Sequence, residues 1–516
     1  MKNNKYFITG GTGFVGSFIV KHLLEQGHTV ICLVRDSNEL SGKQRLIEIL
    51  NRIPSEKGID VKSLDVICGD IRYDYLGIKD SMKLQGVKYL IHAAASVDFN
   101  NDKPDELYNL NISGALRAIS MAYYCSIPNF CYISTAYVSG KSQGEIMEHP
   151  LDCERQYNNY YEKSKAMAEL ALSRYASRHE IHLSIIRPGI VVGDSINGYT
   201  PSLMNIYSFI YPILKMKNYA ESRLSETSAI EDIYSTRICI AANEDTSLNI
   251  IPVDIVADAT VKVIQREKKG INYFHLLDPS PMKMKEIVRY VIELTGFKGI
   301  ELISPDIYSP MIKTGINRLL EKQNRLYLGY TTSVASYSTE NLRDILPVID
   351  KRALIYRMTE FINERIHSKS EVVNTDSYRD IIHYFDSYLK AKEGRKLVND
   401  LGDFSSNFAI DFRDIPVKPW MIQIEHGILH SVSRDDGYIH TDCIYKVSSG
   451  IFRKLINSAL TPQDGFFSGE VDIEGDIKHG LQLASLMEIF FKENTYYGSD
   501  NRIAGKESAE CSSSLN

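Results

Sequence analysis

The sequence predicts an α/β protein in which a doubly wound parallel sheet with a C-terminal cap is followed by a separate, smaller α+β unit. Residues 5 to about 195 alternate short apolar runs with amphipathic helical stretches. A polar stretch at 367–377 interrupts the chain, and beyond it apolar residues return with a different spacing. Because each part has its own apolar pattern, we expect two cores.

The apolar runs of the first part are its expected strands. They are Tyr6–Ile8, His28–Val34, Asp65–Cys68, Tyr89–His92, Phe130–Ile133 and Leu183–Ile186. Strands this apolar are buried on both faces, and the helical stretches between them allow parallel pairing. These features together predict the doubly wound sheet.

Residues 196–366 contain more Tyr and Ser and longer helical segments. In doubly wound enzymes, a C-terminal region of this kind covers the crevice at the carboxyl ends of the strands and shapes the substrate pocket. We therefore expect a first domain over 1–366, with the cap mainly within 196–366.

The stretch 367–377 is polar and is the predicted linker. The second unit is expected over 378–497. Its elements would be a helix near 378–400, alternating strands between 407 and 448, a helix near 449–459, a strand at 466–473 and an amphipathic helix from 476. The tail at 498–516 is rich in Ser, Glu and Asn and is predicted to be disordered.

Composition narrows the classes of function. A net charge of −6 gives no field for holding nucleic acid or an anionic membrane. The 8 cysteines are scattered, with no pair at zinc or redox spacing, so neither a metal site nor a disulfide framework is expected. No apolar run reaches the roughly 20 residues of a membrane span, and Met1–Lys5 leaves no room for a signal peptide. We expect a cytoplasmic protein without a membrane segment.

A glycine-rich run, Thr9–Gly16, stands between the first strand and a helix expected over 14–26. Gly10, Gly13 and Gly16 would permit a tight turn, close approach of backbone N–H groups to a pyrophosphate, and close packing of the helix on the sheet. The helix N-terminus adds partial positive charge. The run predicts a dinucleotide site.

Arg35, at the end of the second strand, bears on which dinucleotide binds. An NAD enzyme places Asp or Glu there for the ribose 2′-hydroxyl, whereas Arg can pair with the 2′-phosphate of NADP. Asp36 follows directly and keeps NAD as the alternative, but Arg35 favours NADP(H). Asp70 and Ile71, after the third strand, occupy the usual place of adenine recognition.

Tyr161 and Lys165 are four residues apart and share one helix face. Carbonyl reduction needs a proton donor on the oxygen, and a neighbouring ammonium lowers the pKa of a Tyr hydroxyl toward a useful range. Two other pairs, Tyr211/Lys215 and Tyr388/Lys392, have the same spacing. Only the first pair follows a strand end bearing hydroxyls, at Thr135, which could polarise a substrate oxygen.

Residues 1 to about 360 resemble extended short-chain dehydrogenases/reductases, and most closely the branch of fatty acyl-CoA reductases and carrier-protein thioester reductases. The segments that carry the resemblance are Thr9–Gly16, His92–Phe99, Asn111–Gly114, Ser134–Val138, Tyr161–Lys165, Arg187–Asp194 and Ile251–Asp254. The C-terminal region typical of eukaryotic fatty acyl reductases is absent. Coenzyme A and an acyl carrier protein therefore both stay open as the thiol carrier.

The resemblance implies roles for individual residues. Thr135, with Ser134 beside it, would be the catalytic hydroxyl, Tyr161 and Lys165 the proton-transfer pair, and Asn111 would orient Lys165 through water. The cofactor residues implied are Gly10, Thr12, Gly13, Phe14, Val15, Gly16, Arg35, Asp70, Ile71, Ala93, Ala94, Tyr161, Lys165 and Pro188.

The second unit resembles sterol carrier protein domains over about 376–495. The resemblance rests on the run Gly465–Asp476, on the apolar helix that follows, and on the Ser448–Ile456 helix. It implies an apolar tunnel for an acyl chain, a sterol or another lipid, and no catalysis.

Three functions remain open on the sequence. The leading one is NADPH-dependent reduction of a long-chain acyl thioester to an aldehyde or alcohol, with the second domain binding the lipid. The second is an NAD(P)-dependent sterol or hydroxy-lipid dehydrogenase using the same residues. The third is a non-catalytic lipid carrier with a vestigial nucleotide fold, against which the intact Thr135, Tyr161 and Lys165 set argues. The oligomeric state is left open.

Overall fold

The computed structural model describes residues 3–35, 41–55, 58–97, 104–151, 155–222, 237–311, 315–367, 381–397, 404–414, 417–434 and 441–496. The predicted linker, apart from its first residue, and the predicted tail lie outside these residues. Among the described helices, none is both long and apolar enough to cross a membrane.

The first part is built on a parallel 7-stranded sheet in the order β12-β7-β5-β4-β1-β2-β3. Its strands are β1 (Lys5–Thr9), β2 (Thr29–Val34), β3 (Leu64–Cys68), β4 (Tyr89–His92), β5 (Asn129–Ile133), β7 (His182–Pro188) and β12 (Ile271–Leu276). The predicted doubly wound parallel sheet is confirmed. β1 pairs with β2 on one side and β4 on the other, so the strand order reverses there and a ligand crevice opens at the carboxyl ends.

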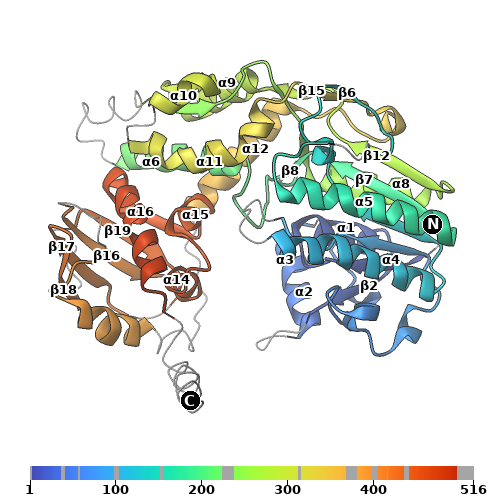
Figure 1. The fold of residues 1–516 in the computed structure, drawn as a ribbon, viewed down its shortest axis with the longest axis horizontal. Coiled ribbons are helices and arrows are strands. Elements are labelled where there is room, and N and C mark those ends of the chain that lie inside the picture. The colour runs from blue at the N-terminus through green and yellow to red at the C-terminus, as the bar shows by residue number, and fades with distance from the viewer. Residues whose placement is uncertain are drawn as a thin grey trace, which may run out of the picture.

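Helices cover both faces of this sheet (Figure 1). One face packs on α1 (Phe14–Glu25), α2 (Gly42–Arg52) and α8 (Val253–Gln265). The other packs on α4 (Gly114–Tyr124) and α5 (Tyr160–His179). This two-sided burial explains why the strands are almost continuously apolar. β12 and α8 come from the segment expected to form mainly the cap, so that segment also completes the sheet.

The cap consists of long helices and short paired strands. Its elements are β8 (Ile190–Val192), α6 (Tyr207–Ser222), β9 (Ile238–Ala241), β10 (Ser247–Leu248), β11 (Ile250–Pro252), β13 (Met282–Lys283), α9 (Met284–Thr295), β14 (Ile300–Ile303), α10 (Pro305–Met311), α11 (Gly315–Thr331), β15 (Ala335–Tyr337) and α12 (Lys351–His367). Short elements elsewhere in the first part are α3 (Pro104–Tyr108), β6 (Gly144–Ile146) and the turns η1 (Val61–Ser63), η2 (Asp74–Gly77), η3 (Ser81–Leu84), η4 (Asn109–Ser113), η5 (Ala136–Ser139) and η6 (Glu340–Leu342).

The second unit has a mixed 5-stranded sheet in the order β18-β17-β16-β19-β20. Its elements are η7 (Tyr384–Leu389), η8 (Lys390–Lys392), β16 (Ser406–Phe412), β17 (Trp420–Glu425), β18 (Ile428–Arg434), β19 (Cys443–Val447), α14 (Ser449–Ile456), α15 (Pro462–Phe467), β20 (Val471–Gly475) and α16 (Ile477–Glu493). The predicted α+β unit is confirmed.

The strand predicted at 466–473 is wrong in its first half. Residues 462–467 form the short helix α15, and the strand β20 begins only at Val471. The reason is local: the Thr461 hydroxyl accepts a hydrogen bond from the Asp464 amide at 3.0 Å, and Pro462 takes the first helical position. A side-chain cap followed by Pro starts a helix even where the next residues are apolar.

The second unit packs directly against the cap, with α15 and α16 next to the cap helices α6 and α11 (Figure 1). Residue contacts join α15 to α6 and α16 to α11. The ring of Tyr211 meets that of Phe466 edge-on at 5.6 Å. Next to them, Lys215 forms a nearly buried ion pair with Asp472, which also pairs with Arg413 at 3.3 Å. The pair Tyr211/Lys215, with its catalytic-like spacing, therefore joins the two halves of the molecule.

Candidate active site

The glycine-rich loop brings β1, β4 and α1 into close contact. Gly10 has φ +78°, and a side chain there would collide with the backbone N of Ala94, 2.4 Å from its Cβ position. A side chain on Gly16 would lie 2.1 Å from the carbonyl O of Gly10, so α1 could not pack on the loop. The helix starts after Gly13, which has no side chain to occupy the first amide donors. Those amides fit a pyrophosphate.

A cleft of about 260 Å³ lies beside this loop at the carboxyl ends of the strands. Of the expected cofactor residues, it is lined by Gly13, Phe14, Val15, Gly16, Ala93, Tyr161, Lys165 and Pro188. Thr135 lines it too, together with Ser134. Gly10 and Ala94 lie behind the loop and shape it, and Thr12 is a half-buried part of the same turn.

Thr135 and Tyr161 reach this cleft from different elements. Thr135 follows β5 and caps η5, its Oγ1 accepting from the Tyr137 amide at 3.3 Å. Tyr161 lies in the first turn of α5, which Asn159 caps. Burial, with a smaller effect of the Glu162 carboxylate, raises the pKa of Tyr161 above its ordinary value. The sequence predicted that the Lys165 ammonium lowers the pKa of Tyr161, but in this structure the effect of burial is larger.

Lys165 points toward the sheet. Its Nζ donates to the carbonyl O of Ile133 at 2.6 Å and lies 4.2 Å from the centre of the Tyr132 ring. Burial lowers the pKa of Lys165 to about 7, against the opposing effect of the Glu169 carboxylate. The side chain can therefore carry or lose its proton near neutral pH, as a proton relay needs.

Below the cleft runs a buried charge network that the sequence analysis did not identify. Glu169 accepts from the Ser134 hydroxyl at 2.5 Å and pairs with Arg187 at 2.7 Å. Arg187 also lies against His275, whose pKa burial lowers to about 4. The signal was present in the sequence, because Glu169 follows Lys165 by four residues and so lies on the same helix face.

Asn111 is buried in η4, a single π-type turn between α3 and α4. Its side chain accepts from the Ser96 amide at 2.8 Å and donates to the Ser164 hydroxyl at 2.9 Å. It thus joins the loop after β4 to the residue beside Lys165. π-turns of this kind are frequent at functional sites.

Arg35 and Asp70 lie together beyond the other end of the dinucleotide loop. Burial alone would raise the pKa of Asp70, but hydrogen bonds from Arg72 and the charge of Arg35 lower it overall. Arg45, from α2, donates to the carbonyl O of Arg35 at 2.7 Å. Ile71 packs on the start of α4, its Cδ1 lying 2.9 Å from the Cβ position of Gly114. The alternative Asp36 lies outside the described residues.

The cap supplies cleft residues that no motif indicated: Asn205, Tyr327 and Tyr330. The Tyr330 hydroxyl accepts from the side-chain Nδ2 of Asn159 at 2.9 Å. It also bonds to Glu162, whose pKa is raised by burial. Helix α11 is thereby held onto the N-terminus of helix α5. No local pattern could have found these residues, because α11 follows α5 by some 150 residues.

Residues 8–260 match the family described as male sterility protein, and residues 385–488 match the SCP-2 sterol transfer family. The first part of the chain thus contains an extended short-chain dehydrogenase/reductase domain, and the second part contains an SCP2 domain. The predicted resemblance to both families is confirmed. The first domain is an oxidoreductase domain with a nicotinamide dinucleotide site.

Two curated relatives show the range of this domain. The chain is 27% identical over 349 residues to sterol-4-alpha-carboxylate 3-dehydrogenase, decarboxylating, of Dictyostelium discoideum, covering 65% of this chain and 97% of that protein. It is 26% identical over 261 residues to the NRPS-like oxidoreductase fscA of Fusarium equiseti, covering 49% of this chain but 24% of that protein. The match to the second relative thus spans about a quarter of its length.

Two solved structures share the fold. The terminal R domain from the myxalamid PKS-NRPS biosynthetic pathway superposes with a TM-score of 0.56 at 21% identity, covering 72% of this chain and 93% of that one. A thiolation-reductase di-domain from an archaeal non-ribosomal peptide synthetase superposes with a TM-score of 0.54 at 19% identity. That match covers 70% of this chain and 76% of the other chain. The shared fold includes the cap, since the coverage exceeds the sheet domain alone.

Proposed function

We propose that this chain is an NADPH-dependent reductase of a long-chain acyl thioester, carried on coenzyme A or a carrier protein, and that its SCP2 domain binds the lipid. The observation that carries the proposal is the position of Thr135, Tyr161 and Lys165. They line one cleft beside the dinucleotide loop, and the cleft borders an apolar chamber in the cap. The resemblance to thioester reductase R domains supports the reaction class.

The dinucleotide would lie along Gly13–Gly16 and Ala93, with its adenosine end toward Arg35 and Asp70. Arg35 and Arg45 come from adjoining segments and provide cations for a 2′-phosphate. These contacts support NADPH over NADH.

The reduced nicotinamide, when bound, supplies a hydride to the carbonyl carbon. The hydroxyls of Tyr161 and Thr135 hold the carbonyl oxygen as negative charge develops on it. The carbon–sulfur bond then breaks, the thiolate leaves and takes up a proton, and an aldehyde remains. Lys165 lies behind Tyr161 on α5 and can return a proton to that hydroxyl. A second hydride, from a second NADPH, with a proton on the oxygen, would give the alcohol.

For the SCP2 domain we propose lipid binding without catalysis. An apolar cavity lies between η7, one face of its sheet and α16, and Phe408, Ile422, Leu483 and Phe490 are among its lining residues. We propose domain bounds of 1–366 and 378–497, with a linker between them. The Tyr388/Lys392 pair of this domain has a structural role, since both side chains donate to Asn494.

The test is a coupled measurement on the full chain with the dodecanoyl thioester of N-acetylcysteamine as substrate. We expect NADPH to be consumed as free thiol is released. One NADPH should be consumed per thiol if the product is the aldehyde, and two if it is the alcohol. NADPH consumption without thiol release would contradict thioester reduction.

A second function has its own support in the sterol dehydrogenase relative, 97% of which the match covers. The same Thr135, Tyr161 and Lys165 would then oxidise a hydroxy-sterol. Reduction of NAD(P)⁺ with a 3β-hydroxysterol, and no thiol release from the thioester, would favour this alternative. Failure of both reactions, with lipid binding retained, would favour a non-catalytic carrier.

A further inference from the structure

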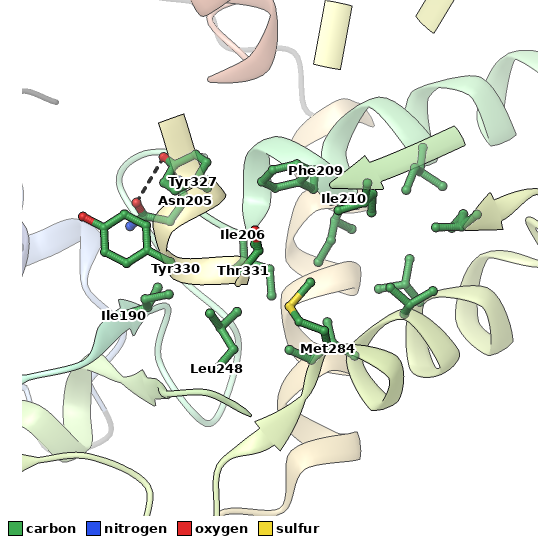
Figure 2. A pocket seen from close by; sticks show the side chains of 16 residues that line it. Ile190, Asn205, Ile206, Phe209, Ile210, Leu248, Met284, Tyr327, Tyr330 and Thr331 are labelled. Atoms are coloured by element: carbon green, nitrogen blue, oxygen red, sulfur yellow. Dashed lines mark hydrogen bonds between the residues drawn. The ribbon is translucent and has the colours of Figure 1, made fainter. Parts of the chain in front are cut away.

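An apolar chamber lies inside the cap (Figure 2), and it adjoins the active-site cleft. Its walls come from α6, α9 and α11 and from the short strands β9, β10 and β14. Phe209 and Ile210 of α6 face Met284 and Leu248 across it. Most side chains of the wall are aliphatic or aromatic.

The polar groups in the wall are engaged within the protein. The Tyr327 hydroxyl accepts from the Asn205 amide at 3.1 Å and donates to the Asn205 Oδ1 at 3.3 Å. The Thr331 hydroxyl donates to the carbonyl O of Ala241 at 2.8 Å. Tyr330 is bound to Asn159 and Glu162, as described above. A polar ligand would therefore lose its hydration without recovering equivalent bonds.

The chamber and the active-site cleft share part of their walls. Ile190, Asn205, Tyr327 and Tyr330 line both. Asn205 and Tyr327, whose hydrogen bond is drawn in Figure 2, therefore lie at the boundary between the two cavities. Asn205 has φ +57°, a left-handed conformation that Asn tolerates better than most residues, and the bonds from Tyr327 hold it there. A ligand in the cleft can extend past this pair into the chamber.

The size of the chamber selects among apolar ligands. Its volume is about 60 Å³, whereas an engineered cavity of about 150 Å³ holds a single benzene ring. A fused sterol ring system therefore does not fit, while the end of a flexible alkyl chain, one methylene wide, does.

We propose that this cap chamber binds the distal end of the substrate's hydrocarbon chain while the reacting carbonyl lies beside Tyr161 and Thr135. The inference rests on the proposed function and specifies its substrate: an unbranched acyl chain long enough to pass Asn205 and Tyr327. The chamber, and not the SCP2 cavity, then sets the chain-length preference of the chemical step.

Binding can be tested without turnover. The full chain is irradiated with dodecanoic acid carrying a diazirine at its terminal carbon, and the labelled peptides are mapped by mass spectrometry. Because the SCP2 cavity also binds lipid under the proposed function, labels are scored separately for the two cavities. We expect labels on α6 or α9 at Phe209, Ile210 or Val288, in addition to any in the SCP2 domain. Labels confined to the SCP2 domain would overturn the inference.

Chain-length selectivity is the second test. Val288→Phe fills the chamber, and Leu486→Phe is the matched change in the SCP2 cavity. Each methylene excluded from an apolar site costs about fourfold in affinity. Val288→Phe should therefore lower the ratio of kcat/KM for dodecanoyl over hexanoyl thioester at least about tenfold, mainly through KM. Leu486→Phe should leave this ratio unchanged.

Phe209→Ala provides the opposite change and should move the preference toward longer chains, which keeps the test decisive if Val288→Phe does not fold. Thioester turnover with a ratio unaffected by both chamber variants would overturn the inference and leave the proposed function standing. Labels in the chamber without any thioester reduction would overturn the proposed function and leave the binding of an alkyl chain in the chamber standing.

Discussion

The two halves of this molecule each hold an apolar cavity, and the two cavities differ in what surrounds them. The cap chamber borders a cleft with Tyr161, Lys165 and a buried Glu169–Arg187 pair. The SCP2 cavity is lined by apolar side chains and Tyr384, a tyrosine buried among aromatic rings. Both cavities therefore offer apolar walls of the kind that hold hydrocarbon. Under the proposed function, only the polar groups beside the cap chamber make that cavity part of an enzyme site.

The two halves should differ most in the effect of removing a tyrosine hydroxyl, at Tyr161 in the first domain and at Tyr388 in the SCP2 domain. Tyr161→Phe should lower hydride transfer by about 10²–10⁴-fold, because the oxygen of the substrate loses its proton donor. Cofactor affinity should change little. The measurement is single-turnover NADPH oxidation, with NADPH binding followed by fluorescence. Tyr388→Phe removes a hydroxyl at the same Tyr/Lys spacing in the other half and should leave the chemical step unchanged. Equal effects of the two variants would mean that the site is misplaced.

The contact between the halves is the next test. Asp472→Leu leaves Lys215 and Arg413 without their carboxylate in a nearly buried position. Removing one partner of a buried ion pair costs about 3 kcal/mol. We expect a lower thermal unfolding midpoint, measured by calorimetry. Glu474→Leu removes an exposed partner of Lys446 from the same strand and should cost much less. If both variants unfold like the unmodified chain, the domains do not depend on this contact.

Cofactor selectivity should depend on the first half alone. Arg35→Ala removes a cation from the 2′-phosphate site and should reduce the NADPH-over-NADH preference about tenfold, since Arg45 stays nearby. Dissociation constants for both cofactors, from fluorescence titration, give the ratio. Arg434→Ala, a change of the same kind in the SCP2 domain, is the control. An unmodified chain that binds the two cofactors equally would contradict the NADP assignment.

The smallest effect concerns pH. Lys165 has a pKa of about 7, so its ammonium is present below pH 7 and is lost as the pH rises through 7. If the ammonium returns the proton to Tyr161, kcat should fall about fivefold between pH 7 and 8. Lys165→Arg stays charged and should abolish the fall of kcat above pH 7, even if its overall rate is low. Lys392→Arg, the control in the SCP2 domain, should keep that fall. A flat profile in the unmodified chain would exclude Lys165 as the proton source.

Much of the architecture could be predicted from local patterns. The runs around Tyr6, Tyr89 and Leu183 became strands of the main sheet, because a strand buried on both faces must be continuously apolar. The glycine-rich run became the β1–α1 turn, because Gly10 and Gly16 have no space for side chains. The strand expected at 466–473 was wrong in its first half, since the cap at Thr461 outweighed the apolar residues that follow.

By itself, the sequence determined the order of elements, both families and the set of Thr135, Tyr161 and Lys165, because each depends on residues close together in the chain. Tertiary structure alone decided that Lys215 bonds to Asp472 across the domain contact, and that Asn205 and Tyr327 lie between the cleft and the cap chamber. Those contacts join segments more than 100 residues apart. Their partners are selected by packing, which leaves no periodic signal in the sequence.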